Sequence, residues 1–495
     1  MQSYSFFVKY KYFKKNIHIF VSIKIDKTIY IMFSANTYKS RREELRKRIG
    51  NGLILIPGNT FSPNNYPNNA YYFRQDSTFL YYFGLNLPTL MAVIDAESGE
   101  EMLFGDDFTV EDIIWTGPQP RLVELGAGVG VANCQPLKAL DGVIAAAMKQ
   151  GRKIHYLPPY RGESKIELSR LLGLPISELY NHKSVDLMFA VAEMREVKSA
   201  EEIEALERAF QLGYAMHTTA MKMCKAGVVE REIAGAMEGV AKANGLGVSF
   251  PSIVSQHGET LHNLNCDGVL ENGRLLLVDA GAESVENYCS DHTRTYPVSG
   301  KFSQKQRDIY EIVLRAHDKA PKNMRTGAMY MEEVHKKALL SLAEGLHDVG
   351  LIHGSAEDAV EAGAMYLFMP HGLSHGLGMD VHDCEAMGER SYDFSEMKER
   401  AVASGTCVYR AAWKLREGTV MSNEPGIYFI PALIDKSKAE GLYKGIVNYD
   451  LLDEYRDFGG IRIEDDIVVT AEGGRVIGDK HIPSTVEELE AVVGK

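Results

Sequence analysis

The chain has few of the features that indicate an oxidising compartment, a nucleic-acid partner or a membrane. Its six cysteines are scattered over 495 residues without a C-x-x-C pair, which fits a reducing cytoplasm better than a disulfide framework. The net charge of -13 is the opposite of the positive surplus that nucleic acids and anionic membranes attract. We therefore expect a cytoplasmic protein that acts on small molecules or peptides, with neither nucleic acid nor membrane as its partner.

The first 31 residues contain no long hydrophobic run. A membrane-spanning helix needs about 20 mostly apolar residues, and a signal peptide needs an uninterrupted apolar core. Lysines break this segment at Lys9, Lys11, Lys14, Lys15, Lys24 and Lys27. We expect Met32 to be the natural start and residues 1–33 to be a non-native or disordered extension. A basic membrane-surface or targeting segment is the alternative.

The remaining length exceeds what one hydrophobic core usually serves, so two domains are expected. Residues 34–190 alternate short apolar runs with helical segments, and the runs at 53–58 and 91–95 predict strands of an α/β domain. Ser199 followed by Glu202 is a capping-box pattern that predicts a helix start. We therefore place a linker at residues 191–199 and a second domain at residues 200–495.

Potential metal ligands follow one another along the second half of the chain. They are Asp279, Asp291, His375, Glu424 and Glu464. Four carboxylates and one imidazole balance the charge of two divalent cations held roughly 3.5 to 4 Å apart, and such a pair lowers the pKa of a shared water. The set predicts a two-metal hydrolase. Mostly oxygen ligands favour manganese, with cobalt, zinc or iron as alternatives.

Strand patterns suggest how the ligands meet. Residues 274–279 and 288–296 predict two strands with a short connection, and a hairpin would bring Asp279 and Asp291 together. Residues 460–469 predict one further strand. Its alternation puts Arg462, Glu464 and Asp466 on one face, which suggests a solvated, functional side.

The short sequence segment around each candidate ligand also has a plain structural explanation. Asp279 before Ala-Gly is typical of a turn, as is Glu424 before Pro-Gly. His371 and His375 at i, i+4 fit core histidines equally well, since an isolated H-x-x-x-H is a weak metal signal. Asp291 fits a residue that caps an edge strand, and Glu464 with the two following acids fits a solvated acidic face. Five such explanations must hold at once if the residues are not ligands, and we therefore prefer the metal centre.

In the short segments around these residues, and over nearly everything after Met32, the chain resembles the proline-specific metallopeptidases of the aminopeptidase P and prolidase family. The segment 73–79, which includes Arg74, resembles that family's N-terminal domain. The resemblance implies a two-domain α/β protein, with a creatinase-like α/β N-terminal domain and a pita-bread α+β catalytic domain. It also implies that the five residues named above bind metal. It further assigns catalytic or accessory roles to His262, His371, His382 and Arg462.

Two positions depart from the family pattern. Gly376 replaces the bulky aromatic residue that often follows the ligand histidine, so one wall of the substrate pocket is expected to be more open or filled from elsewhere. His292 stands beside Asp291 where the family usually has an aliphatic residue. On a strand it points away from the face of Asp291, so we expect packing or second-shell bonding rather than metal ligation.

The resemblance implies hydrolysis of the bond between an N-terminal residue and proline in short peptides. Glu424 is expected to pass a proton to the prolyl nitrogen, and Arg410 lies near the position where dipeptide-cleaving members bind the substrate carboxylate. The preference for dipeptides or longer peptides stays open. The family also implies a homodimer. The alternatives are a metal-free pita-bread module that binds peptides, a creatine-hydrolysing enzyme and a methionine aminopeptidase. The first two are expected to lack the ligands, and the third lacks a large N-terminal domain.

Overall fold

The N-terminal region is built on a mixed five-stranded sheet. In the computed structural model, which describes residues 32–385 and 414–495, the strand order is β6-β5-β4-β1-β7. The strands are β1 (Leu53–Pro57), β4 (Met91–Asp95), β5 (Glu101–Phe104), β6 (Asn133–Gln135) and β7 (Ile154–His155). β1 and β4 are antiparallel, and β1 is parallel to β7. The strands predicted at 53–58 and 91–95 are therefore confirmed.

Both faces of this sheet are buried, as the run of aliphatic residues in β1 requires. Ile54 and Ile56 belong to one apolar cluster, whereas Leu53 and Leu55 belong to a second cluster on the other face. Because side chains alternate along a strand, one short apolar sequence serves two layers of helices.

Helices cover both faces. They are α2 (Ala35–Ile49), α3 (Ser77–Phe83), α5 (Leu122–Val129), α6 (Ala139–Lys149), α7 (Gly162–Leu172) and α8 (Val185–Glu196), whereas α4 (Val110–Thr116) has no buried residue. α2 contacts α3, α5 and α8, whereas α6 contacts α7. A small hairpin of β2 (Pro63–Tyr66) and β3 (Asn69–Ala70) stands apart from the sheet.

The chain leaves this region through two successive helices. α8 includes residues 191–196 of the expected linker, and α9 (Ala200–Met223) begins directly after Ser199. The Ser199 side chain accepts a hydrogen bond from the Glu202 backbone, and Glu202 reciprocates. The capping box predicted from the sequence is confirmed. Leu206 and Phe210 lie on the buried face of α9.

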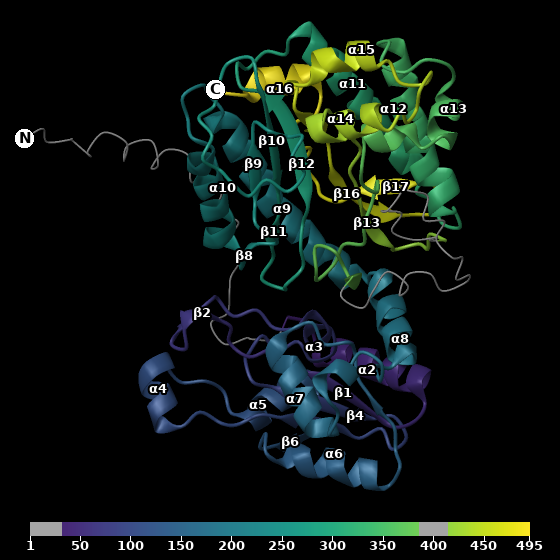
Figure 1. Ribbon diagram of the computed structural model, residues 1–495. Coiled ribbons are helices and arrows are strands. Elements are labelled where there is room, and N and C mark those ends of the chain that lie inside the picture. Colours follow the sequence, from purple (N-terminus) through teal and green to yellow (C-terminus); the bar gives the residue numbers. More distant parts are fainter. Residues whose placement is uncertain (1–31, 386–413) are drawn as a thin grey trace, which may run out of the picture. The chain divides into compact units, whose positions relative to one another are not determined.

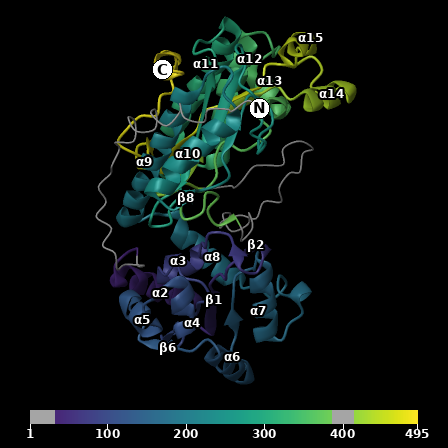
Figure 2. The same cartoon turned by 90° about the vertical axis from the view of Figure 1, so that its left-hand side faces the viewer.

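Helix pairs and small sheets make up the second region. α9 packs against α10 (Glu230–Asn244) beside the β9-β10-β12 strands, and α11 (Gln304–Lys319) packs against α12 (Lys336–Asp348) (Figures 1 and 2). The other helices are α13 (Ala356–Glu361), α14 (Pro431–Ala439), α15 (Tyr449–Leu452) and α16 (Val486–Val492). Short helices of other types in this region are η2 (Ala320–Asn323), η3 (Tyr330–His335), η4 (Ala364–Leu367) and η7 (Asp453–Tyr455), and the N-terminal region contains η1 (Ile176–Glu178) between α7 and α8.

Four small sheets belong to this second region. The first has the order β12-β10-β9, the second β13-β16-β17, and two further pairs are β14-β15 and β8-β11. Their strands are β8 (Gly247–Val248), β9 (Ile253–Ser255), β10 (Leu275–Ala280), β11 (Ala282–Glu283), β12 (His292–Pro297), β13 (Val420–Asn423), β14 (Gly426–Tyr428), β15 (Gly460–Arg462), β16 (Asp465–Val469) and β17 (Gly474–Val476).

The prediction of a single strand over 460–469 with a solvated charged face is wrong. β15 pairs with β14, and β16 pairs with β13. Between them the Glu464 backbone bonds to Thr293 of β12 (N to O, 3.0 Å). The chain thus changes its strand partner at Glu464. Its charged residues Arg462, Glu464 and Asp466 are buried there, not solvated.

Among the described residues, no helix is long and apolar enough to cross a membrane.

Candidate metal centre

The first two carboxylates come from one antiparallel strand pair. β10 and β12 pair with Asp279 opposite Thr293 and Ala280 opposite His292, as the predicted hairpin requires. Asp279 lies near the end of β10, and Asp291 immediately precedes β12. Both carboxylates are buried.

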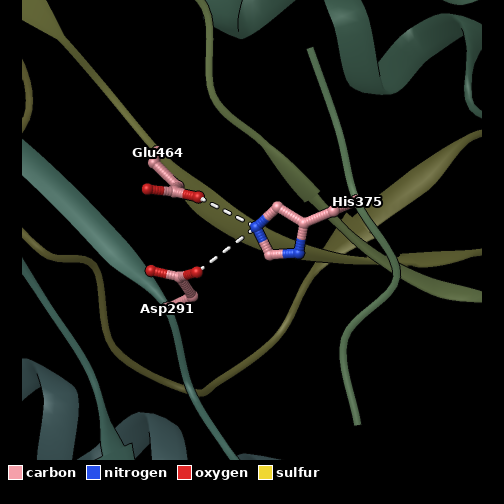
Figure 3. A group of neighbouring side chains, drawn as sticks. All are labelled: Asp291, His375 and Glu464. Atoms are coloured by element: carbon pink, nitrogen blue, oxygen red, sulfur yellow. Dashed lines mark ion pairs between the residues drawn. The ribbon is translucent and has the colours of Figure 1, made fainter. Parts of the chain in front are cut away.

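Three carboxylates, including that of Asp291, converge on the ring of His375. Its Nε2 lies 3.3 Å from Asp291 Oδ2, 3.5 Å from Glu424 Oε1 and 3.8 Å from Glu464 Oε1. Figure 3 shows the carboxylates of Asp291 and Glu464 facing the same ring nitrogen. Asp291, His375 and Glu464 each offer a ligand atom within 4.8 Å of the others. Residues far apart in the sequence therefore form one potential metal-binding group.

The backbone around His375 fixes which ring nitrogen faces the carboxylates. Its Nδ1 lies 3.1 Å from the Gly376 carbonyl oxygen, a contact that a protonated Nδ1 satisfies by donating. The lone pair of a neutral ring is then on Nε2 and is directed toward the carboxylates. The His375 backbone N–H also donates to Ser422 Oγ (3.0 Å), which ties the histidine to β13.

The carboxylates repel one another in a buried setting. Burial and the charge of Asp291 raise the pKa of Glu464 well above its usual range. Glu424 and Asp279 add to this rise, and Arg462 opposes it. A cation among these groups would relieve the repulsion, because it favours the ionised form of every carboxylate around it.

The donor set fits hard divalent cations. Four carboxylates and a neutral imidazole are suitable ligands for such ions, and Asp279 Oδ1 is buried without a hydrogen-bond partner among the described residues. The lone pair of His375 Nε2 facing oxygen atoms is unfavourable unless a proton or a cation lies between them. Both observations agree with metal binding at this group.

Arg462 connects Asp279 to the rest of the cluster. Its Nη2 donates to Asp279 Oδ2, its Nε donates to Thr293 Oγ1 (3.0 Å), and its Nη1 donates to the Tyr428 hydroxyl (2.9 Å). The guanidinium is almost fully buried and therefore holds a fixed orientation.

Tyr428 is a site residue that the sequence analysis did not assign. Its hydroxyl also lies 2.8 Å from His371 Nε2, so it joins Arg462 to His371. A Cβ at Gly426 would lie 2.5 Å from that hydroxyl. In the sequence, the only available signal was the glycine two positions earlier on the same strand face, and such a signal is common in strands.

The accessory histidines fall into two groups. His371 Nδ1 lies 3.7 Å from Glu424 Oε2, and the ring of His382 stacks on that of His375 with centroids 4.0 Å apart. His262 is exposed on the segment between β9 and β10. Within the described residues it makes no hydrogen bond or ion pair with the other candidates. Arg410 lies outside the described residues.

His292 is a packing residue. Its ring lies against Phe210 and His217, and it is completely buried. Neither ring nitrogen has a hydrogen-bond partner among the described residues, and burial lowers its pKa to about 3. The packing role expected for His292 is observed, and its Nε2 also lies 3.6 Å from Asp466 Oδ2, which accepts a hydrogen bond from the Asp291 backbone.

Comparisons with known proteins agree on the family and the fold. The model of metallopeptidase family M24 matches residues 204–471, and that of the aminopeptidase P N-terminal domain matches residues 38–155. A probable Xaa-Pro aminopeptidase of Aspergillus clavatus is 32% identical over 433 residues, covering 85% of this chain and 88% of its own. The Xaa-Pro dipeptidase of Homo sapiens is 29% identical over 465 residues, covering 91% and 90%.

A solved structure extends the likeness to three dimensions. The zinc-substituted aminopeptidase P of E. coli, in complex with product, superimposes with a TM-score of 0.74 at 27% identity, over 93% of this chain and 98% of that one. The expected creatinase-like N-terminal domain and pita-bread catalytic domain are confirmed.

Proposed function

This chain belongs to metallopeptidase family M24, and on that premise we propose that it is a dinuclear-metal exopeptidase that hydrolyses the bond between an N-terminal residue and proline. The observation that carries the proposal is the convergence of Asp291, Glu424 and Glu464 on Nε2 of His375. Relatives named Xaa-Pro aminopeptidase and Xaa-Pro dipeptidase support the choice of substrate.

The proposed ligands are the five residues of the cluster: Asp279, Asp291, His375, Glu424 and Glu464. Two divalent ions bound there would lower the pKa of a water and polarise the scissile carbonyl. Manganese is the ion that the oxygen-rich set favours, and cobalt, zinc and iron fit the same donors.

Glu424 is the ligand best placed to move a proton. Its side chain is 14% exposed, whereas those of His375 and Glu464 are 2% and 3% exposed. The side chains of Asp279 and Asp291 are 11% and 7% exposed, so Glu424 is the most exposed of the five proposed ligands. In our proposal its carboxylate takes a proton from the attacking water and delivers it to the prolyl nitrogen. That nitrogen carries no hydrogen of its own in the peptide bond and needs the proton as the bond breaks.

The neighbouring side chains orient the reactants. Arg462 holds Asp279 and the Tyr428 hydroxyl, and Tyr428 in turn fixes His371 beside Glu424. We assign to His371 and His382 the contact with the substrate carbonyl, where donors stabilise developing negative charge. His262 and Arg410 keep their proposed substrate roles from the family resemblance.

Hydrolysis of three peptides tests the proposal. Purified protein with added Mn²⁺ is incubated with Ala-Pro, Ala-Pro-Ala and Ala-Ala, with a chelator in half of the samples. Cleavage of Ala-Pro alone identifies a dipeptidase, and release of alanine from Ala-Pro-Ala identifies an aminopeptidase. Peptide binding without chelator-sensitive cleavage would instead support a binding module and would refute the enzyme proposal.

Two further features belong to the same proposal. We propose a homodimer, as the family resemblance implies, and a cytoplasmic location. Light scattering coupled to size-exclusion chromatography measures the first, since a monomer mass at micromolar concentration would contradict it. Cell fractionation measures the second.

A further inference from the structure

His382 is carried by a segment without helix or strand. Residues 376–385, here called the His382 loop, connect the candidate ligand His375 to the end of the first described range. The ring of His382 stacks on that of His375 at 4.0 Å with an interplanar angle of 27°. Whatever holds this loop therefore also sets where the His382 imidazole meets the metal centre.

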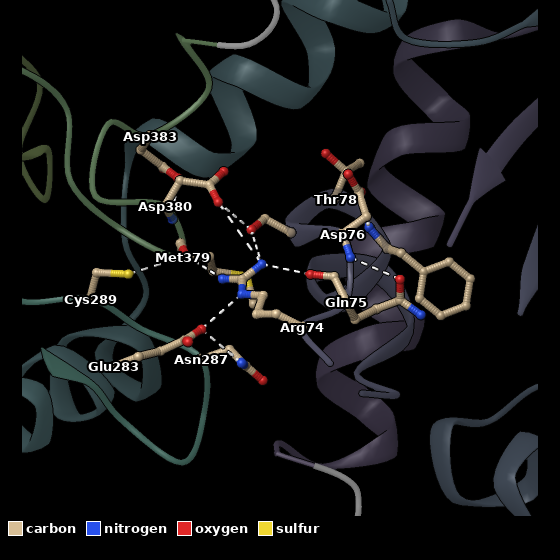
Figure 4. A network of polar contacts seen from close by, with 12 residues as sticks. Arg74, Gln75, Asp76, Thr78, Glu283, Asn287, Cys289, Met379, Asp380 and Asp383 are labelled. Atoms are coloured by element: carbon tan, nitrogen blue, oxygen red, sulfur yellow. Dashed lines mark hydrogen bonds and ion pairs between the residues drawn. The ribbon is translucent and has the colours of Figure 1, made fainter. Parts of the chain in front are cut away.

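Arg74, from the N-terminal region, is the hub of the contacts that hold the loop. Its Nη2 donates to the Met379 carbonyl (2.5 Å), and its Nη1 donates to Ser77 Oγ (2.5 Å). The Ser77 hydroxyl donates to Asp380 Oδ1 (2.5 Å). On its other side, Arg74 Nε donates to Glu283 Oε1 (2.9 Å). Figure 4 shows the guanidinium between Glu283 and the segment of Met379 and Asp380.

The loop is also anchored by two cationic side chains, Arg195 in the last turn of α8 and Lys198 between α8 and α9. Arg195 Nη2 lies 2.9 Å from Asp380 Oδ2 and 2.5 Å from Asp383 Oδ1, and Lys198 Nζ lies 3.2 Å from Asp383 Oδ2. Asp383 is the residue after His382, and its carboxylate is buried. Arg74 and Arg195 thus grip both ends of the short turn that presents His382.

Leu377, Met379 and Cys384 pack into the core, whereas Asp380 and His382 are only partly buried, so the polar contacts act on the part of the loop that packing holds least. A cavity of about 240 Å³ lies against it and is lined by His382 and Asp380, together with Asp76 and Tyr160. Cys384 has a φ of 61°, a left-handed conformation that a non-glycine residue keeps only when its surroundings hold it there.

We propose that Arg74 is a positioning residue that acts through Ser77 and Asp380 to hold His382 in place over His375. This inference rests on the proposed exopeptidase function, for which His382 contacts the substrate. The contact of Arg74 with Glu283 ties the loop to β11, which follows the strand that carries Asp279. The N-terminal region thereby contributes to the geometry of the metal centre.

Steady-state kinetics of Arg74→Met tests the role in catalysis. We expect kcat for the cleaved Xaa-Pro peptide to fall about 10- to 100-fold, the range for a displacement of roughly 1 Å, with KM little changed. Arg74→Lys should recover only part of kcat, because an ammonium cannot reproduce the planar fork. Arg152→Met is the matched control, since Arg152 makes an ion pair with Asp95 within the N-terminal region and has a similarly exposed side chain (21% against 30%). It should keep the parental kcat and KM.

A double-mutant cycle separates positioning from general stabilisation. If Arg74 acts through His382, adding Arg74→Met to His382→Ala should cause no further loss of kcat. Independent, multiplicative losses would overturn the proposal, as would parental kcat in Arg74→Met. Should Arg74→Met fail to fold, Ser77→Ala carries the same cycle, because it removes only the hydroxyl that joins Arg74 to Asp380.

Hydrogen exchange provides a readout that does not depend on activity or metal. Amides of residues 376–385 should exchange at least several-fold faster in Arg74→Met than in the parent or in Arg152→Met. Unchanged exchange in this loop would refute the inference even if the protein proves to be an Xaa-Pro exopeptidase. Faster exchange in a protein that cleaves no Xaa-Pro peptide would instead preserve the loop contact and refute the proposed function.

Discussion

The sheet of the N-terminal region buries aliphatic side chains on both faces, whereas the strands around the candidate metal centre bury charged ones. In β1, Leu53 and Leu55 face one apolar cluster and Ile54 and Ile56 face the other. In the second region, Arg294, Asp465 and Asp466 are as deeply buried as those aliphatic residues. Burying a charge is unfavourable unless it is paired. The second region therefore retains a polar network that stability alone does not require.

This difference separates what stabilises each region from what each region does. A truncated side chain in an apolar layer lowers the free energy of unfolding in proportion to the volume removed. A buried network of ion pairs depends on every member. Substitutions in the apolar layers of the first region should therefore alter stability alone, whereas substitutions in the buried polar network of the second region should alter stability and catalysis together.

The largest effect is expected from Glu424→Gln. Loss of the proton-carrying carboxylate should lower kcat by roughly 10²- to 10⁴-fold while the protein stays folded, as measured by peptide hydrolysis and circular dichroism. Glu440→Gln, at the exposed end of α14, is the control and should match the parent. Normal turnover in Glu424→Gln would remove Glu424 from the mechanism.

Arg294→Met should reduce both stability and activity. Arg294 bonds Asp465 Oδ1 (2.8 Å) and the Glu464 carbonyl oxygen (2.7 Å). Its loss leaves the buried Asp465 carboxylate with His317 as its remaining partner (Nε2 to Oδ2, 3.2 Å) and costs about 3–5 kcal/mol of unfolding free energy. Urea unfolding and kcat measure the two effects. Adding Asp465→Asn should restore part of the stability. If Arg294→Met loses stability but keeps full kcat, the network and the site are separate.

Leu55→Ala should reduce stability alone. Leu55 is buried in the apolar cluster on the second face of the sheet, and truncation at such a position costs about 2–5 kcal/mol. Chemical denaturation should show this loss, while kcat per folded molecule stays at the parental value. Val123→Ala, on a half-exposed residue of α5, is the control and should cause little change. A fall in kcat of folded Leu55→Ala would contradict the separation of the two regions.

The smallest effect concerns acid stability of the N-terminal region. Burial acts to raise the pKa of Asp95, but Arg152 and neighbouring backbone N–H groups lower it to about 2. Since this lies below the value of about 4 in the unfolded chain, the stabilisation is complete above pH 4 and disappears as the pH falls through 2. Asp95→Asn should therefore lose on the order of 2 kcal/mol at pH 7.

Unfolding free energies measured from pH 7 down to pH 2 check this expectation. The difference between Asp95→Asn and the parent should shrink as the solution is acidified. Asp186→Asn, at a side chain 72% exposed, should show no such trend. A difference that stays constant with pH would mean that the charge of Asp95 is not what stabilises the sheet.

Local patterns predicted the elements whose causes are local. The strands at β1 and β4 and the capping box of Ser199 follow from short-range rules, and the structure has all three. The pairing of β10 with β12 was also predictable, because a short connection leaves few alternatives. The resemblance to the family further identified Arg462, which contacts Asp279.

Long-range contacts were beyond the same reasoning. The strand predicted at 460–469 is broken at Glu464 because successive parts of it pair with different strands. Residues before Glu464 pair with β14, Glu464 itself bonds to β12, and the residues after it pair with β13. No local sequence pattern contains that choice. Tyr428 joins the site only because two other elements bring Arg462 and His371 to its hydroxyl.

The sequence by itself determined the types and order of the candidate ligands, since residue chemistry does not depend on the fold. Only the tertiary structure decided that Nε2 of His375 faces three carboxylates and that Arg74 holds the loop of His382. The physical reason is distance along the chain. Arg74 and Met379 are some three hundred positions apart, and only the packing of the two regions places a guanidinium against that carbonyl.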